Sequence, residues 1–227
     1  MENRFKGVVF DFDGTLADTF PGIFEAWKQT FEKLNLGLVS PERVKRAIGP
    51  TKDAYLRIIL DDKYESHGQA ALDSFRAIYK GESIFTTKLY PGIQELLDRL
   101  DTTGTRMAIA SNKPHGQVVK LVEHLGIADY FCPVLGPEKV KEGKPAPDMF
   151  LECARDWSMP VDRIVVAGDT ELDMIAGVSA GMSRAAVLWG YSDERTLTAQ
   201  APDFVVSTPA ALGEVILKTP ELAGVRG

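Results

Sequence analysis

The stretch GVVFDFDGTLADT, residues 7–19, predicts a buried strand that ends in a sharp polar turn. Its first four residues, Gly7–Phe10, form a short apolar run of the kind expected in a strand covered on both faces. Asp11 and Asp13 follow directly, and positions two apart in an extended chain point the same way. Both carboxylates therefore leave the carboxyl end of the strand together, and Gly14 permits the turn that comes next.

Further short apolar runs along the chain have the character of strands. These are Arg106–Ala110, Cys132–Leu135, Arg163–Ala167, Ala185–Leu188 and Asp203–Val206. Helix-period segments lie between them, at Ile93–Leu100, Val118–Leu125, Asp148–Ala154 and Leu172–Ala180. This alternation predicts an α/β fold with a doubly wound, Rossmann-like parallel sheet in the strand order 3-2-1-4-5.

A long segment interrupts this rhythm after the first strand. Residues 11–105 separate the first two strands, whereas a whole strand-helix-strand unit takes roughly 30 residues. We therefore expect an inserted helical cap domain at residues 17–88 and a core domain made of residues 1–16 and 89–227. Aromatic residues at helical spacing begin the insert, and we expect them to pack inside it: Phe20, Phe24, Trp27 and Phe31.

Composition restricts the classes of function. The 227 residues carry 26 Lys+Arg against 32 Asp+Glu, a net charge of -6, and 44% are hydrophobic, which excludes a disordered or fibrous chain. An acidic protein is a poor ligand for nucleic acid. No apolar run approaches the roughly 18 residues of a membrane span, and the first residues do not resemble a secretory signal. Because Cys132 and Cys153 form no close motif, a cytoplasmic protein is expected.

A second pair of acids extends the pattern set by Asp11 and Asp13. Asp169 follows the strand Arg163–Ala167, and Asp173 comes one helical turn later. In the predicted order this strand neighbours the first, so the four carboxylates would converge at the point where strand order reverses. Such a cluster requires a cation or a retained proton. The alternative is that Asp169 caps the next helix and Asp173 interacts with its dipole.

Two more polar sites follow strands or lie in a stiff loop. Ser111 and Asn112 come directly after Arg106–Ala110, where a hydroxyl and backbone N–H groups can hold phosphate oxygens. These residues could equally cap the following helix. Lys144 lies in a proline-rich loop and could neutralise a phosphate and a nucleophile, although most lysines are solvated.

Together these segments resemble the haloacid dehalogenase-like superfamily, which hydrolyses substrates through an aspartyl-phosphate. The resemblance rests on four motifs in order: DFDGTLADT at residues 11–19, ASN at 110–112, GKPAPDMF at 143–150 and GDTELDM at 168–174. It covers the whole chain, including the cap. The later Gly190-Tyr191 and the run PDFVV at 202–206 are similar to the phosphoglycolate-phosphatase-like branch. Ala146 stands where many members of that branch have histidine, which leaves the substrate open.

The resemblance implies a role for each acid. Asp11 would attack phosphorus as the nucleophile. Asp13 would protonate the leaving alcohol and then deprotonate the attacking water. Mg²⁺ would bind the Asp11 side chain, the Asp13 main-chain carbonyl and Asp169, with Asp173 in a supporting position.

The remaining motif residues would handle the phosphoryl group. By the same resemblance, Ser111, Asn112 and Lys144 would bind it, and Thr15 would brace the loop of the first motif. The implied function is a Mg²⁺-dependent phosphatase that acts on a small phosphorylated metabolite, such as phosphoglycolate or a sugar phosphate. The alternatives are a phosphomutase similar to β-phosphoglucomutase and a non-catalytic binding or regulatory protein. The expected protein binds neither nucleic acid nor membrane and is a monomer or homodimer.

Overall fold

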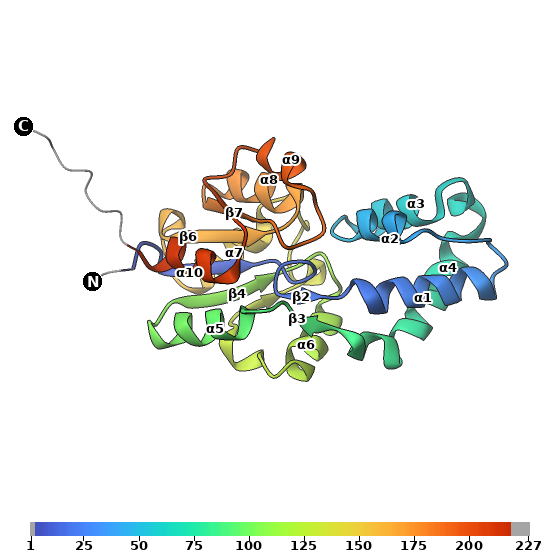
Figure 1. Cartoon of the computed structure of the whole chain (residues 1–227). Helices are drawn as coiled ribbons and strands as arrows, with labels where there is room; N and C mark the ends of the chain where they lie inside the picture. Colours follow the sequence, from blue (N-terminus) through green and yellow to red (C-terminus); the bar gives the residue numbers. More distant parts are fainter. Residues whose placement is uncertain (1–2, 219–227) are drawn as a thin grey trace, which may run out of the picture.

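The computed structural model describes residues 3–218, apart from the side chains of residues 82 and 83. A six-stranded sheet in the order β5-β4-β1-β6-β7-β8 forms the centre of one lobe (Figure 1). Its strands are β1 (Gly7–Phe10), β4 (Arg106–Ala110), β5 (Val134–Leu135), β6 (Ile164–Gly168), β7 (Ser183–Val187) and β8 (Phe204–Val206). Every neighbouring pair is parallel. The predicted order is confirmed, and the last strand extends it by one.

Alternating side chains of the central strand divide the core into two layers. Val8 and Phe10 belong to the cluster that also holds buried residues of α5 (Ile93–Thr102), α6 (His115–His124) and α10 (Pro209–Leu217). Val9 points the other way, toward α7 (Asp148–Asp156) and α8 (Glu171–Ala180). The two helical layers lie on opposite sides of the sheet in Figure 1. Because both faces are covered, apolar residues run continuously along β1.

The segment between β1 and β4 is helical, as the spacing predicts. It contains α1 (Phe20–Lys33), α2 (Pro41–Ala47), α3 (Lys52–Leu60) and α4 (Tyr64–Tyr79). Trp27 is fully buried there and stacks on Phe75, with ring centroids 4.5 Å apart. Phe31 is also buried, whereas Phe20 and Phe24 are half-buried and stack on each other. The aromatic stripe of α1 therefore packs mainly within the insert.

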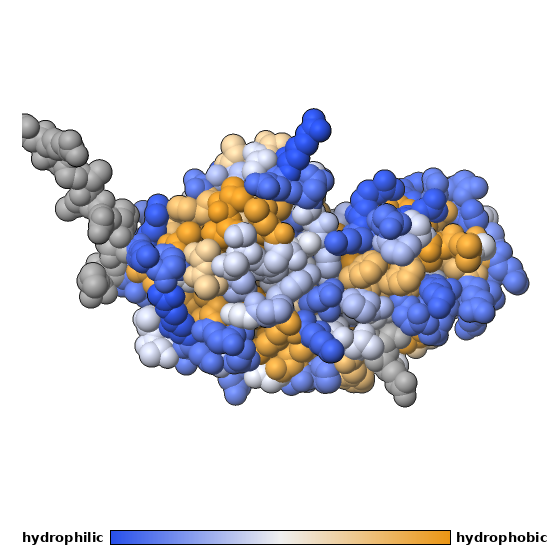
Figure 2. All heavy atoms as spheres, in the orientation of Figure 1, coloured by the Kyte–Doolittle hydropathy of each residue, from blue (hydrophilic) through white to orange (hydrophobic). Residues whose placement is uncertain are grey.

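Smaller elements complete the chain. Short 3₁₀ helices occur at Asp61–Lys63, Glu82–Thr86, Ala128–Tyr130, Pro137–Lys139 and Val161–Arg163, and a short α9 at Glu194–Thr198. The two connections to the insert run side by side as the antiparallel pair β2 (Ala17–Asp18) and β3 (Lys88–Leu89). Figure 2 shows the two lobes joined through this region, with a notch between them. None of the helices within residues 3–218 is long and apolar enough to cross a bilayer.

Candidate active site

The loop after β1 brings two carboxylates to the carboxyl end of the sheet. Asp11 and Asp13 are 3% and 7% exposed. Gly14 has φ +83, and a Cβ built on it would lie 2.2 Å from a carboxylate oxygen of Asp169. A side chain at this position would therefore meet both an unfavourable backbone conformation and a direct clash. The glycine lets the β1 loop approach the end of β6.

Three of the four predicted acids converge. Asp11, Asp169 and Asp173 are buried, and each offers an oxygen within 4.8 Å of the others. Asp11 and Asp169 follow the neighbouring parallel strands β1 and β6, so strand pairing itself places them at one edge. The site thus lies at the predicted point where the strand order reverses.

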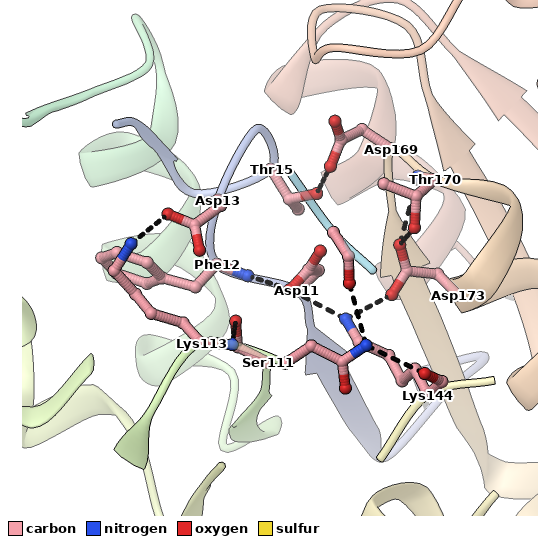
Figure 3. Close-up of polar contacts among 12 residues, drawn as sticks. Asp11, Phe12, Asp13, Thr15, Ser111, Lys113, Lys144, Asp169, Thr170 and Asp173 are labelled. Carbon is pink, nitrogen blue, oxygen red and sulfur yellow. Dashed lines mark hydrogen bonds and ion pairs between the residues drawn. The ribbon is translucent and has the colours of Figure 1, made fainter. Parts of the chain in front are cut away.

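Lys144 reaches into this acidic cluster from the loop before α7. Its Nζ lies 2.8 Å from Asp11 Oδ1 and 2.7 Å from Asp173 Oδ1, and the residue is 1% exposed (Figure 3). The main-chain N–H of Phe12 donates to the same Asp11 oxygen at 2.7 Å. Lys144 is therefore a buried member of the site, and the solvated alternative is wrong for it.

Asp169 and Asp173 are each held by groups that orient them. Thr15 Oγ1 donates to Asp169 at 2.9 Å, and the Tyr191 N–H donates to its other oxygen at 2.8 Å. The N-cap of α8 is Thr170, whose hydroxyl and N–H both donate to Asp173 Oδ2. Asp169 therefore does not cap the helix. Asp173 belongs to a capping box in the first turn of α8 and also contacts Lys144.

The carboxylate of Asp13 turns away from the other three acids. Its Oδ1 accepts hydrogen bonds from Lys113 Nζ at 2.9 Å and from Thr19 Oγ1 at 2.5 Å (Figure 3). Lys113 is 8% exposed, so this is a buried ion pair. Neither Lys113 nor Thr19 is among the site residues predicted from the sequence. A usable signal was present, because Lys113 lies two positions after Ser111 and so projects to the same side of an extended chain.

Ser111 and Asn112 lie beside these acids at the end of β4. Ser111 is 1% exposed and its Oγ accepts from the Lys113 N–H at 3.2 Å. Asn112 donates through Nδ2 to the carbonyls of Lys144 at 2.9 Å and of Gly49 at 2.8 Å, which ties the insert to the core. The N-cap position of α6 is Pro114, so neither residue caps that helix as the alternative proposed.

Burial controls the electrostatics of the cluster. It raises the pKa of Asp11 well above its ordinary range, with Lys144 acting in the opposite direction. Burial likewise raises the pKa of Asp169 to about 7, opposed by the Tyr191 N–H. Burial alone would lower the pKa of Lys144, but Asp11 and Asp173 outweigh it and raise that pKa above its usual value. The site therefore favours added positive charge.

Counting charges tests whether a metal fits. Three carboxylates and the Lys144 ammonium leave two uncompensated negative charges when all are ionised. Asp13 is balanced separately by Lys113. A divalent cation would cancel the remainder, and buried carboxylate oxygens are the ligands that hard cations such as Mg²⁺ prefer. The three buried carboxylates therefore fit a divalent cation such as Mg²⁺.

Without a divalent cation, the free energy of unfolding is expected to fall as pH rises from about 4 to about 7. In the folded protein the pKa of Asp169 is about 7, so Asp169 keeps its proton across this range. In the unfolded chain the pKa of an aspartate is about 3.9, so the same proton has been lost. The raised pKa therefore stabilises the fold at low pH and ceases to do so at higher pH. One pKa unit is about 1.4 kcal/mol, so the contribution of Asp169 to this loss is on the order of 4 kcal/mol.

Urea unfolding in chelator at about pH 5 and about pH 8 measures this difference. Added Mg²⁺ is expected to reduce it, because a bound cation replaces the proton. The Asp169→Asn variant serves as the control and should show a shallower dependence on pH. A chelated wild-type protein equally stable at both pH values would contradict this account of the acidic cluster.

The chain is similar in sequence to a known family and to proteins of known function. The sequence pattern of haloacid dehalogenase-like hydrolases matches residues 8–187. A phosphoglycolate phosphatase of Aquifex aeolicus is 33% identical over 205 residues, covering 90% of this chain and 93% of that protein. A phosphoglycolate phosphatase of Vibrio parahaemolyticus is 30% identical over 221 residues, covering 93% and 96%.

Solved structures agree with the sequence comparisons. A protein from Lactobacillus delbrueckii subsp. bulgaricus superposes with a TM-score of 0.86 at 27% identity, covering 96% of this chain and 100% of that one. A hydrolase from Pseudomonas syringae gives a TM-score of 0.78 at 25% identity, covering 93% and 99%. Relatives of known structure therefore cover 93% to 96% of this chain.

Proposed function

The chain belongs to the haloacid dehalogenase-like hydrolases and is a phosphatase of that family, and we propose that it hydrolyses a small phosphate monoester with Mg²⁺ through an aspartyl-phosphate. The observation that carries the proposal is the buried cluster of Asp11, Asp169 and Asp173 around Lys144. The names of the relatives favour a phosphatase over a phosphomutase, and phosphoglycolate is the substrate that those names suggest.

Asp11 is the proposed nucleophile. A carboxylate oxygen forms a bond to phosphorus while the bond from phosphorus to the ester oxygen breaks. Lys144 and the Phe12 N–H both hold Asp11 Oδ1, at 2.8 Å and 2.7 Å, which fixes the orientation of the carboxylate before substrate arrives. Orientation of this kind removes much of the entropic cost of bringing the two reacting groups together.

Asp13 is the proposed acid and base. It gives a proton to the departing alcohol oxygen, then takes one from the water that attacks the aspartyl-phosphate, and phosphate leaves with Asp11 restored. Lys113 and Thr19 hold its Oδ1, which leaves its second oxygen for the proton. Both steps use the same carboxylate in alternate protonation states, so no further residue is required for proton transfer.

The cofactor and the phosphoryl ligands complete the proposal. Mg²⁺ would be held by the side chains of Asp11 and Asp169 and the main-chain carbonyl of Asp13, and would supply positive charge against the phosphoryl oxygens. Asp173 also contacts Lys144 Nζ, at 2.7 Å, and so helps to orient it. Ser111, Asn112 and Lys144 line the place where the phosphoryl group would sit, with Lys144 as a fixed point charge.

The division of the chain follows from the same proposal. Residues 17–88 would form a cap domain over the site, and residues 1–16 and 89–227 the catalytic core. The paired connections β2 and β3 are the natural hinge, because they are the short links between the two parts. The cytoplasmic location and the choice between monomer and homodimer stay predictions.

Removal of divalent metal is expected to abolish turnover. Phosphate release from an aryl phosphate should fall to less than about 1% in EDTA, because about two buried negative charges would then face a dianionic substrate. Mg²⁺ in excess should restore the rate. The measurement is inorganic phosphate released over time, with phosphoglycolate tested in parallel. Turnover that continues undiminished in metal-free buffer would rule out the metal-dependent mechanism.

A further inference from the structure

A cavity of about 360 Å³ separates the insert from the catalytic acids. Its floor is polar and comes from the core, where Asp11, Asp13, Ser111 and Lys113 face it. Its opposite wall comes from the insert. The apolar and aromatic side chains there are Ile23, Ile48, Tyr55, Leu72, Phe75 and Tyr79, and the polar ones are Thr51, Lys52 and Arg76. If the phosphoryl group occupies the floor, the alcohol part of the substrate must lie against this wall.

The wall is built mainly on one face of α4. Leu72, Phe75, Arg76 and Tyr79 all line the cavity, and their spacing of three and four residues puts them on one side of the helix. Phe75 is stacked between Trp27 at 4.5 Å and Tyr79 at 5.3 Å, measured between ring centroids. This aromatic stack makes the wall a rigid surface.

Arg76 is the exception in this apolar face. It is half-buried, and within residues 3–218 its guanidinium has no carboxylate or carbonyl partner. The insert's other arginines include Arg43, 3.8 Å from Asp61, and Arg57, 3.1 Å from Glu65. A ligand that fills the cavity would desolvate the Arg76 guanidinium, so it must itself supply a partner for that charge.

Resting on the proposed function, we propose that the substrate is the phosphate monoester of an alcohol with an apolar body and a second anionic group, and that Arg76 binds that anion. The apolar body covers the wall formed by Leu72, Phe75 and Tyr79. A sugar that lies on Leu72 and Phe75 would bury hydroxyls against side chains that offer no hydrogen bond, which is unfavourable. Glycolate would leave most of the wall uncovered in a cavity whose volume suits larger ligands, roughly 300–1,000 Å³.

Four phosphates of primary alcohols test both features while keeping the leaving groups chemically similar. They are ethyl phosphate, hexyl phosphate and the phosphates of 3-hydroxypropanoate and 6-hydroxyhexanoate. A buried methylene contributes about fourfold, so kcat/KM should be at least about tenfold higher for hexyl than for ethyl phosphate. The carboxylate of the 6-hydroxyhexanoate ester should raise kcat/KM about 10- to 100-fold above that of hexyl phosphate, because it gains a hydrogen bond between charged groups.

Substitution of Arg76 tests whether this residue causes the preference for a substrate with a second anionic group. Arg76→Met keeps an apolar stem but removes the charge, and it should lower kcat/KM for the 6-hydroxyhexanoate ester at least about tenfold more than for hexyl phosphate. Arg46→Met is the matched control, because Arg46 is exposed on α2 and does not line the cavity. It should leave all four substrates unchanged. Arg76→Lys should restore part of the preference.

The outcomes separate this inference from the proposed function. Phosphate release from all four esters at similar kcat/KM, or equal losses for both long esters in Arg76→Met, overturns the inference and leaves the phosphatase intact. A hexose phosphate hydrolysed with higher kcat/KM than the 6-hydroxyhexanoate ester also overturns it. No phosphate from any of the four esters in the presence of Mg²⁺ overturns the inference. If phosphoglycolate and an aryl phosphate also release none, the proposed function fails with it.

Discussion

Replacing Asp11 with asparagine is expected to lower kcat for phosphate release by at least about 10⁴-fold, because the amide cannot attack phosphorus. The substitution keeps the shape of the side chain. It also removes one of the carboxylates of the buried cluster, so the fold should be retained or stabilised in metal-free buffer. Lys144 keeps its contact with Asp173 at 2.7 Å and is not left unpaired.

Steady-state phosphate release with an aryl phosphate measures the Asp11 effect, and urea unfolding checks the fold. Asp156→Asn is the control, because Asp156 is an exposed carboxylate at the end of α7. It should leave kcat unchanged. If Asp11→Asn retains more than a few per cent of wild-type turnover, the covalent role of Asp11 is wrong.

Replacing Asp13 with asparagine is expected to lower kcat by about 10²- to 10⁴-fold, the usual contribution of a general acid and base. The two half-reactions should respond differently. The phenolate of an aryl phosphate made from an acidic phenol is a good leaving group and needs no proton. Asp11 should therefore still be phosphorylated at close to the normal rate. Hydrolysis of the aspartyl-phosphate needs Asp13 to accept a proton from water, and it should become the slow step.

Rapid mixing of Asp13→Asn with such an aryl phosphate tests this division. A burst of phenol equal to the enzyme concentration, followed by slow turnover, is the expected result. Lys113 loses its ion pair in this variant, so Lys113→Met combined with Asp13→Asn serves to separate the proton-transfer defect from an unpaired buried charge. A normal steady-state rate in Asp13→Asn would exclude the acid–base role.

The position of the site could be predicted because topology alone determines it. Asp11, Ser111 and Asp169 each follow a buried apolar run, and the ends of parallel strands meet at one edge of the sheet. The helical character of the insert could likewise be predicted from the spacing of its aromatic residues, but the full extent of α4, which begins at Tyr64, could not. Gly68 lies inside that helix, where packing outweighs its low helix propensity.

Side-chain pairings could not be predicted in the same way. Asp13 turns toward Lys113 and Thr19 because a rotamer depends on which buried partner is within reach, and only the folded chain brings these groups together. Tyr191 meets Asp169 from a loop 22 residues along the chain. The cavity wall depends on which face of α4 packs on α1, and contacts such as the stacking of Phe75 on Trp27 at 4.5 Å fix that orientation.

The most direct measurement is the mass of Asp11 after reaction with substrate. Asp13→Asn is mixed with an aryl phosphate and Mg²⁺, quenched in acid and digested, and the peptide that contains Asp11 is analysed by mass spectrometry. The account predicts that this peptide gains one phosphoryl group on Asp11, and that chelator prevents the gain. Phosphorylation of a different residue, or phenol release with no phosphorylated peptide at all, would contradict it.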